Sequence, residues 1–443
     1  MSGLKVQIYA QIRGCCVTNV KEPGNKVAII IPTFAGGGAE RFASNLGFSL
    51  SKKWDVVNIL YENRVVYPCA GKLITIDSPP GSHALDKIFK LFSRILKIRR
   101  IKRKEGIDVS ISVMESANVV NILSAGRDKT IISTRSFRAV NKDTRDFYTR
   151  VYKFLMRLLY HKVDMTVTVS SLIAQNMIDD FNVQKDRVKV IYNPVDIQSV
   201  EALSREGTGE FERIMKSPVI ITVGRLTFAK GQWHLIKAFR KVKDAFPDAR
   251  LMIVGDGELK SDLTSLCHAL SLKTWRAWAG ETMSDDYDVY FTGFRQNPFM
   301  LMARARVFVL PSLWEGFPNV LVEAMVCGVP VIASDCRSGP REILAPGTDL
   351  SLQTQKPDYG RYGVLMPVCD SGKDITDTHI TSEEGIWSDV LVRSLTDEEF
   401  SQRYKALAKT RILDFKKEHI AQEWEKVIDT VVNNGYNPHE QAS

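Results

Sequence analysis

The sequence predicts an α/β protein with two consecutive domains, each a doubly wound parallel sheet. The chain has 443 residues, which is longer than a domain built around a single hydrophobic core usually is. Short runs of β-branched and other apolar residues recur along it, as expected of strands buried on both faces of a parallel sheet. Helical stretches separate most of these runs, and the alternation starts a second time at Val219.

The first domain is expected at 26–203. It opens on a strand at 27–31, a turn at Gly36-Gly37-Gly38 and a helical stretch that reaches Leu50, which is how a doubly wound domain begins. Residues 1–25 form an irregular extension, and the polar segment 204–217 is predicted to be a linker. Further strands are expected at 56–61, 109–113, 130–134, 165–169 and 188–192.

The second domain is expected at 218–415. Long polar insertions interrupt it at 271–288 and 350–387. The remaining segment, 416–443, contains a helix near 420–432 that follows the second domain and could pack back on the first. Strands of the second domain are predicted at 219–223, 250–254, 289–292, 307–310 and 330–333, with helices at 233–246 and 319–327.

The composition is that of a soluble globular protein, with 44% hydrophobic and 25% charged residues. No apolar run approaches the roughly 18 residues that span a membrane, and no signal-peptide block stands near Met1, so we expect a cytoplasmic protein. The seven cysteines are scattered, which suits neither a disulfide framework nor a zinc site. A net charge of +9 favours nucleic acid, an anionic membrane or a phosphorylated substrate as partner.

The segment 311–325 carries the densest chemical signal: a strand end, a loop and a helix start with Pro318 near its first turn. Backbone amides and the helix dipole at such a start favour a phosphate or diphosphate. The carboxylates of Glu315 and Glu323, eight residues apart, are suitable acceptors for sugar and ribose hydroxyls. On spacing alone, two surface glutamates on a helix and its entry loop are an equally good interpretation.

A second cluster, Gly224 to Gly231, follows the first strand of the second domain. The planar guanidinium group of Arg225 can donate to two phosphate oxygens at once, and the ammonium group of Lys230 can add a second positive charge. A solvated basic loop is the alternative. Because these cations follow a strand and the other cluster opens a helix, we predict that a diphosphate binds between them.

Taken together, several motifs resemble the retaining glycosyltransferases of family 4, strongly over 219–344 and more loosely over 27–195. The resemblance implies a GT-B fold, in which two Rossmann-like domains face each other across a cleft that holds the active site. The motifs are the Glu315–Glu323 pattern, Gly224-Arg225-Leu226 with Lys230-Gly231, Gly255 to Leu259, Gly293-Phe294 and Gly328 to Ser334.

The resemblance also implies roles for individual residues. Arg225 and Lys230 would hold the donor diphosphate, Glu323 would bind the ribose, and Glu315 would contact the transferred sugar as the catalytic carboxylate. No metal or other cofactor is implied, since the cations and the helix start stabilise the leaving group. Main-chain donor contacts are implied for Gly37, Gly38, Phe294, Gly316, Phe317, Asn319 and Val320.

Two positions need a separate interpretation. Many family members carry a histidine where this chain has Arg135. We therefore consider Arg135 as a second catalytic residue, which would bind an acceptor phosphate or the donor sugar, or equally as a structural residue. The pair Asp286 and Asp288 matches a metal-binding motif of the other large glycosyltransferase fold. We interpret it as ordinary acidic loop residues, because it lies in the insertion before a strand.

Residues 87–104 are predicted to form a basic helix with apolar residues at helical spacing. Such a helix suits an anionic lipid surface, although it could also pack one face on the domain and leave a solvated basic face. We expect peripheral contact with the cytoplasmic face of the inner membrane. No nucleic-acid motif is present.

The predicted function is transfer of a hexose or N-acetylhexosamine from a nucleoside-diphosphate sugar, by prevalence a UDP-sugar, to a lipid-linked or saccharide acceptor. Residues 338–343 resemble those of family members that assemble surface polysaccharides, lipopolysaccharide or lipid-carried oligosaccharides. The alternatives are a nucleotide-sugar epimerase of the same fold and a non-enzymatic basic scaffold.

Overall fold

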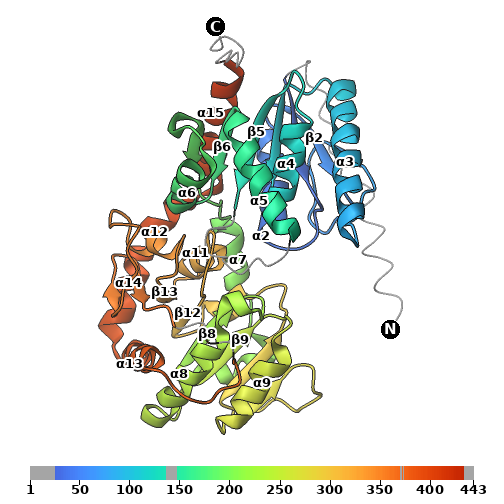
Figure 1. Ribbon diagram of the computed structural model, residues 1–443. Coiled ribbons are helices and arrows are strands. Elements are labelled where there is room, and N and C mark those ends of the chain that lie inside the picture. Colours follow the sequence, from blue (N-terminus) through green and yellow to red (C-terminus); the bar gives the residue numbers. More distant parts are fainter. Residues whose placement is uncertain (1–24, 136–146, 370–371, 373, 434–443) are drawn as a thin grey trace. The chain divides into compact units, whose positions relative to one another are not determined.

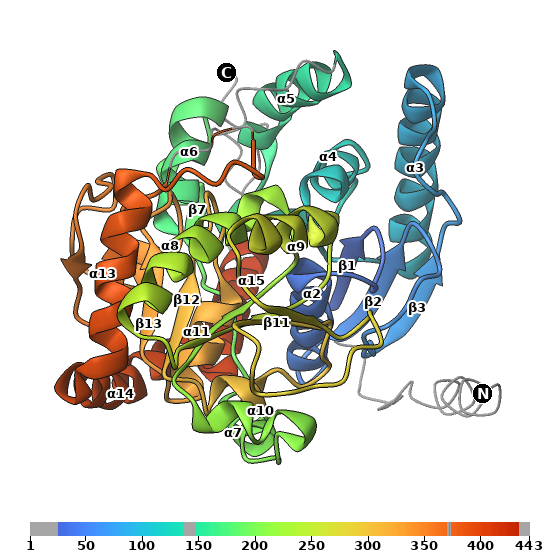
Figure 2. The same ribbon diagram turned by 90° about the horizontal axis from the view of Figure 1, so that it is seen from below.

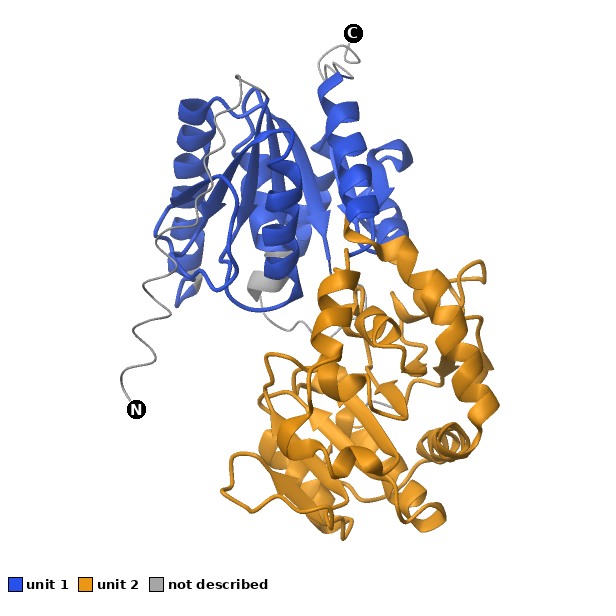
Figure 3. Ribbon diagram, turned by 180° about the vertical axis from the view of Figure 1, so that it is seen from behind, with its two compact units in different colours: residues 1–169, 173–193, 418–443 blue, residues 170–172, 194–417 orange. Residues whose placement is uncertain are grey.

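The structure is a computed structural model that describes residues 25–135, 147–369, 372 and 374–433. The chain divides into two compact units (Figure 3). Unit 1 comprises residues 1–169, 173–193 and 418–443, and unit 2 comprises residues 170–172 and 194–417. The extension predicted at 1–25 lies outside the described residues except for Asn25.

The chain enters unit 2 at Pro194, ten residues before the linker expected at 204–217. Helix α7 (Ile197–Ser204) packs on other helices of unit 2 and buries Val200. The segment 204–217 is not an open linker, because it folds into two 3₁₀ turns that bury Phe211 and Ile214. These apolar side chains explain why the segment packs on unit 2.

Unit 1 is built on a seven-stranded parallel sheet of order β3-β2-β1-β4-β5-β6-β7 (Figure 1). The short strand β3 was not predicted, because its residues are only partly buried and lack a long apolar run. The strands are β1 (Lys26–Ile31), β2 (Asp55–Leu60), β3 (Lys72–Thr75), β4 (Val109–Val113), β5 (Lys129–Thr134), β6 (Met165–Thr168) and β7 (Val188–Val190).

Helices cover both faces of this sheet. Alternate residues of β1 show the arrangement: Ala28 and Ile30 pack in the core that includes α3 and α4, whereas Val27 and Ile29 pack in the core that includes α2 and α15. In that second core, the Phe42 and Trp424 rings lie 5.7 Å apart, which fixes the C-terminal helix on unit 1. The helices are α2 (Gly38–Leu50), α3 (Ala84–Glu105), α4 (Glu115–Leu123), α5 (Phe147–Leu159), α6 (Ser171–Phe181) and α15 (Lys417–Asn433).

Unit 2 is built on an eight-stranded sheet of order β10-β11-β9-β8-β12-β13-β15-β14, parallel except for the pair β14–β15. All five predicted strands are present. The additional strands β10, β14 and β15 come from the insertions at 271–288 and 350–387, in which no strand was predicted. The strands are β8 (Val219–Val223), β9 (Arg250–Val254), β10 (Thr274–Arg276), β11 (Val289–Gly293), β12 (Val307–Leu310), β13 (Val331–Ser334), β14 (Asp358–Tyr359) and β15 (Val364–Met366).

The main core of unit 2 lies between this sheet and helices α8, α9 and α13, with Trp233, Phe239 and Trp387 among its large side chains. Among the described helices, none is both long and apolar enough to cross a membrane. The helices are α8 (Gln232–Ala245), α9 (Lys260–Ala269), α10 (Phe299–Met302), α11 (Asn319–Val326), α12 (Pro340–Leu344), α13 (Ser382–Thr396) and α14 (Glu398–Arg411). The 3₁₀ turns of both units are η2 (Tyr160–Lys162), η3 (Lys185–Arg187), η4 (Gly209–Phe211), η5 (Ile214–Lys216), η6 (Phe228–Lys230) and η7 (Ile412–Phe415).

Candidate active site

Four neighbouring strands of unit 2 end where the predicted donor residues begin. In the order β11-β9-β8-β12, their carboxyl ends lead into Phe294, Gly255, Arg225 and the loop that carries Glu315. Open parallel sheets bind ligands at the carboxyl ends of their strands. Unit 2 therefore gathers residues that are up to 90 positions apart in the sequence along one edge of its sheet.

Glycines allow the backbone of the loop after β9 to pack directly against the backbone of the loop after β8. A side chain at Gly255 would bring its Cβ 1.9 Å from the carbonyl oxygen of Gly224, and one at Gly257 would come 2.3 Å from that of Leu226. The amide of Leu226 donates to the carbonyl of Asp256 at 3.0 Å. The loop after β9 is thus fixed against the loop that carries Arg225.

The loop after β8 meets the loop after β12 in the same way. Gly231 has φ +60°, and a Cβ there would lie 2.3 Å from the carbonyl oxygen of Pro311. The amide of Leu313 donates to the carbonyl of Ala229 at 2.9 Å. This close approach brings Lys230 to the start of the 311–318 loop.

Lys230 and Glu315 form an ion pair as a result. The Lys230 Nζ lies 2.5 Å from Glu315 Oε1, and the two side chains keep 23% and 10% of their surface exposed. The buried Ser312 hydroxyl donates to the same carboxylate oxygen at 2.7 Å. The cation and the carboxylate that were predicted to bind diphosphate and sugar therefore contact each other and remain partly exposed.

The loop between Glu315 and α11 is held from behind by Ser338 and Gly339. The Ser338 hydroxyl donates to the carbonyl of Gly316 at 2.7 Å and lies 2.6 Å from the Ser170 hydroxyl. A Cβ at Gly339 would lie 2.5 Å from Pro318 Cδ, so only glycine leaves room for the loop. These contacts fix the main chain of Gly316, which the sequence assigned to the donor.

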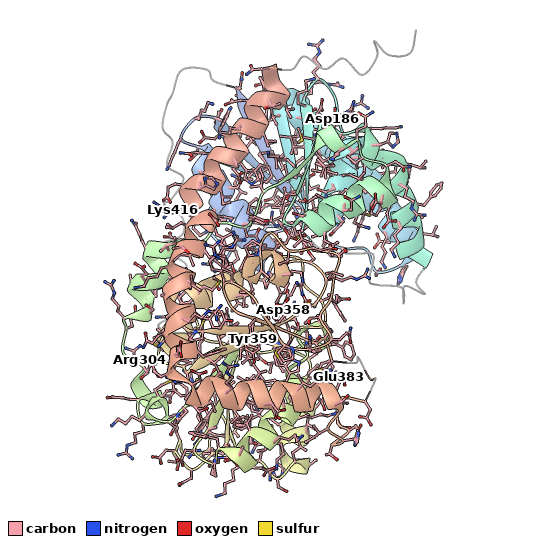
Figure 4. The ribbon with its side chains drawn as sticks, turned by 90° about the vertical axis from the view of Figure 1, so that its left-hand side faces the viewer. Asp186, Arg304, Asp358, Tyr359, Glu383 and Lys416 are labelled. Atoms are coloured by element: carbon pink, nitrogen blue, oxygen red, sulfur yellow. The ribbon has the colours of Figure 1, made fainter. Side chains whose placement is uncertain are left out.

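Charged residues of α12 anchor that support in turn. The single amide N–H of Ser171 is shared by both carboxylate oxygens of Glu342, at 2.9 and 3.0 Å. The Arg341 guanidinium donates to Asp335 at 3.0 Å and to Asp358 of β14 at 3.1 Å. Asp358 and its neighbour Tyr359 are labelled in Figure 4. The 338–343 segment, which the sequence associated with an acceptor class, therefore has a structural role behind the site.

Helix α11 starts with Asn319 and Val320 and carries Glu323 in its second turn. Glu323 is half-buried, and its charge adds to the effect of burial in raising the pKa of the Cys327 thiol to about 12. The side chain of Phe317 is buried and packs on Phe415 with ring centroids 5.5 Å apart. Phe317 can therefore offer a ligand its main chain but not its ring.

Arg225 and Phe294 are both exposed at this edge. The Arg225 carbonyl accepts a hydrogen bond from the Gln232 side chain at 2.9 Å, which fixes its backbone while its guanidinium faces solvent. Phe294 is 78% exposed directly after β11. Arg225 and Phe294 thus follow two strands, β8 and β11, that are separated in the sheet only by β9.

Gly37, Gly38 and Arg135 belong to unit 1, whereas the other predicted site residues belong to unit 2. The amide of Gly37 donates to the Glu40 carboxylate at 3.1 Å at the start of α2. No role was predicted for Glu40, although a glutamate three residues after a helix cap is a recognised capping signal. A donor phosphate at this turn would have to share it with, or displace, that carboxylate.

Arg135 is packed into unit 1. Its guanidinium stacks on the Phe42 ring, 3.5 Å from the ring centroid, and donates to Ser133 Oγ at 3.1 Å and to Asn193 Oδ1. Burial lowers the pKa of Arg135 to about 9. These contacts suit the structural interpretation of Arg135, and its catalytic role stays a prediction.

The aspartates of the discounted metal motif have other partners. Asp288 pairs with Lys243 at 2.8 Å and accepts from the amide of Lys273, and Asp286 accepts from Ser284. In the part of the chain that the structure describes, no three His, Cys, Asp or Glu side chains come together as a metal-ligand set.

Two protein families cover most of the chain. Residues 217–360 match the family described as glycosyl transferases group 1, and residues 36–199 match glycosyltransferase family 4. An uncharacterized glycosyltransferase of Methanocaldococcus jannaschii is 31% identical over 358 residues, which cover 78% of this chain and 84% of that protein.

A second relative, from Campylobacter jejuni, is N-acetylgalactosamine-N,N'-diacetylbacillosaminyl-diphospho-undecaprenol 4-alpha-N-acetylgalactosaminyltransferase. It is 28% identical over 404 residues, covering 90% of this chain and 98% of the relative. Among solved structures, Anabaena HepE in complex with UDP superposes with a TM-score of 0.67 at 17% identity, covering 92% of this chain and all of HepE. The two Rossmann-like units are thus those of a GT-B fold, and the chain belongs to the group 1, family 4 glycosyltransferases.

Proposed function

We propose that this glycosyltransferase moves a hexose or N-acetylhexosamine from a UDP-sugar to a lipid-linked saccharide acceptor, with retention of configuration and without a metal. The observation that carries the proposal is the partly open Lys230–Glu315 pair, set at 2.5 Å between the loop after β8 and the loop before α11. It supplies a cation for a diphosphate and a carboxylate for sugar hydroxyls in one place.

Donor binding would exchange the partners of this pair. The donor diphosphate would take Lys230, with Arg225 and the first-turn amides of α11 as further ligands. Glu315, still held by the Ser312 hydroxyl, would then accept hydrogen bonds from the transferred sugar. Glu323 would bind the ribose, and the main chain around Phe294 would contact the base.

Leaving-group stabilisation is the chemical contribution of these residues. As the bond between the anomeric carbon and the diphosphate oxygen breaks, negative charge grows on the diphosphate, where Lys230, Arg225 and the α11 dipole would stabilise it. The acceptor oxygen bonds to the anomeric carbon on the same face, and its proton passes to the departing diphosphate. This sequence of bond changes needs no metal.

The donor and acceptor classes are supported by the relatives. HepE, which shares the fold, is described in complex with UDP. The Campylobacter relative, named for a diphospho-undecaprenol acceptor, matches 90% of this chain. Assembly of a surface polysaccharide or lipopolysaccharide at the cytoplasmic face of the inner membrane, reached through contact of residues 87–104 with anionic lipid, follows from that acceptor class.

A thermal-shift screen against UDP-, GDP- and ADP-sugars, each with and without EDTA, tests the proposal. We expect one UDP-sugar to raise the melting temperature equally in both buffers, and to do so less in Arg225→Ala. Proton NMR spectroscopy of the stabilising donor, incubated without acceptor, then checks that it is not epimerised. Stabilisation that EDTA removes, or conversion of the donor alone into its epimer, would refute the metal-free transferase.

A further inference from the structure

Helix α3 carries two apolar rows, although packing on a sheet requires only one. The inward row, Leu91, Ile95, Ile98 and Ile101, joins the core with β1 and β2. The second row points to solvent: Leu85 is 82% exposed, Phe89 72%, Phe92 62% and Leu96 68%. Folding of unit 1 therefore does not explain this outward row.

The outward face of α3 changes character along its length. Residues 85, 89, 92 and 96 recur at helical spacing, and the same face continues with Arg99, Arg100 and Arg103. About 16 Å of apolar helix, at 1.5 Å per residue, is thus followed by two basic turns. These arginines and Lys104 are exposed.

The other cations of α3 are occupied within unit 1. Arg94 donates to the carbonyl of Ser78, and Lys97 donates to that of Ile76 at 2.8 Å. Lys102 is buried against Asp128. The basic character predicted for residues 87–104 is therefore concentrated, on the outward side, at the C-terminal end of the helix.

Helix α5 adds a second patch on the same side of the sheet. Phe154 is 61% and Leu158 47% exposed, and their spacing of four residues places them on one helix face. Helix α4 contacts both α3 and α5, and Figure 2 shows the three helices side by side. The described side chains of α5 also include Lys153 and Arg157, with Arg157 exposed.

We propose that these groups form one docking surface for an anionic phospholipid bilayer. The docking surface consists of an apolar part, Leu85, Ile88, Phe89, Phe92, Leu96, Phe154 and Leu158, and a basic part, Arg99, Arg100, Arg103 and Lys104. The apolar side chains enter the boundary between headgroups and acyl chains, and the arginines bind lipid phosphates.

Charge decides between a bilayer and a second copy of the chain. A symmetric dimer through this surface would bring two sets of the same four cations together, in a chain that already carries a net charge of +9. An anionic bilayer neutralises them instead. The inference rests on the proposed function in one respect: a membrane-bound acceptor gives the chain a reason to bind a bilayer. It does not depend on any feature of the proposed donor site.

Co-sedimentation with vesicles tests the docking surface. The whole chain should bind vesicles of phosphatidylcholine with phosphatidylglycerol far better than vesicles of phosphatidylcholine alone. Phe89→Ser/Phe92→Ser should weaken binding at least tenfold, because each phenylalanine loses its apolar burial. Arg99→Ala/Arg100→Ala should weaken it by roughly fivefold for each charge removed, and should reduce its salt dependence.

Phe48→Ser is the matched control, because Phe48 is an exposed phenylalanine (41%) on α2, whose core lies on the opposite face of the sheet. It should bind vesicles like the unmodified chain. Equal binding to neutral vesicles, unchanged binding of the Phe89/Phe92 variant, or a dimer that these substitutions dissociate in the absence of vesicle binding would each overturn the docking surface.

The UDP-sugar thermal shift is measured on every variant in parallel. A retained shift with lost vesicle binding assigns the loss to the docking surface of a folded protein. Vesicle binding by a chain that no nucleotide sugar stabilises would leave the docking surface standing and remove support for the proposed function.

Discussion

Two of the lysine–carboxylate ion pairs, one in each unit, differ in their access to solvent. In unit 1, Lys102 and Asp128 lie 2.8 Å apart with 4% and 2% of their side chains exposed. In unit 2, Lys230 and Glu315 lie 2.5 Å apart with 23% and 10% exposed. The chemistry of the two pairs is the same, and their surroundings are not.

The buried pair is closed by further hydrogen bonds. Lys102 also donates to Ser110 Oγ at 3.1 Å and to Asn121 Oδ1 at 2.6 Å, so protein atoms take up its donors. Burial lowers the pKa of Lys102, and the charge of Asp128 opposes that shift. The open pair lies instead on loops at strand ends, where a ligand can take the place of one partner of the pair. Burial thus separates an ion pair that serves the fold from one that can serve a site.

Breaking the buried pair should have the largest effect. Lys102→Met leaves Asp128 buried without its cation, so we expect the free energy of unfolding to fall by about 3–5 kcal/mol. Urea unfolding followed by circular dichroism measures this. The double variant Lys102→Met/Asp128→Leu should recover much of the loss, and a single variant within 1 kcal/mol of the unmodified chain would show that the pair is not structurally required.

Breaking the open pair should instead cost activity. Glu315→Gln removes the charge that we assign to the transferred sugar, and we expect kcat for donor turnover to fall by about 10²–10³-fold, as when one transition-state contact is lost. The melting temperature should change little, because both partners reach solvent. Full turnover in a folded Glu315→Gln protein would exclude the assigned role.

Substitution of Arg225 tests donor binding without removing either partner of the Lys230–Glu315 pair. Arg225→Ala should weaken nucleotide-sugar affinity by about 10–100-fold, the range expected for a lost hydrogen bond to a charged group. Isothermal titration with the stabilising UDP-sugar measures it. Lys409→Ala, which removes an exposed cation of α14 in the same unit, is the control and should bind the donor normally.

Ser312 is expected to position Glu315 without touching the substrate. Ser312→Ala should lower kcat about tenfold with little change in KM, because the carboxylate loses the hydroxyl that orients it. Ser312→Thr keeps a hydroxyl at the position and should restore part of the rate. An unchanged kcat in Ser312→Ala would show that Lys230 alone orients the carboxylate.

Alkaline pH should weaken unit 2 through its buried thiols. Burial raises the pKa of Cys267 to about 12, and it raises that of Cys336 as well. Above pH 9 the unfolded chain releases these protons and the folded chain keeps them, so the free energy of unfolding falls as pH rises. We expect a loss of about 1 kcal/mol per thiol at pH 10 relative to pH 8.

Urea unfolding of the unmodified chain and of Cys267→Ala/Cys336→Ala at both pH values isolates this effect. The variant should be less stable at pH 8, where it lacks two buried side chains, and should lose less between pH 8 and pH 10. Parallel losses in the two proteins would mean that other groups cause the alkaline effect.

Much of the fold could be predicted from the sequence because the central strands are continuous apolar runs. The strands at 27–31 and 219–223 are of this kind, and each is fully buried or nearly so. The missed strands are two to four residues long. Three of them, β3, β10 and β14, are only partly buried at sheet edges, and β15 is buried but has only three residues inside a polar insertion, so none has a hydrophobic pattern long enough to be read. The domain boundary that was predicted near residue 204 lies earlier in the structure, because apolar residues inside the polar segment 204–217 pack on unit 2.

The sequence by itself determined the α/β class, the family and the residue types of the proposed donor site, because the glycine turns, cations and carboxylates stand in fixed order after buried strands. Only the tertiary structure decided which of them meet. Gly231 lets Lys230 reach Glu315 across 85 residues, and Ser312 joins them because β8 and β12 are neighbours in the sheet. Pairing between distant strands depends on sheet order, which local patterns do not encode. The second apolar row of α3 was likewise visible as spacing, but its exposure appeared only once the inward row was packed.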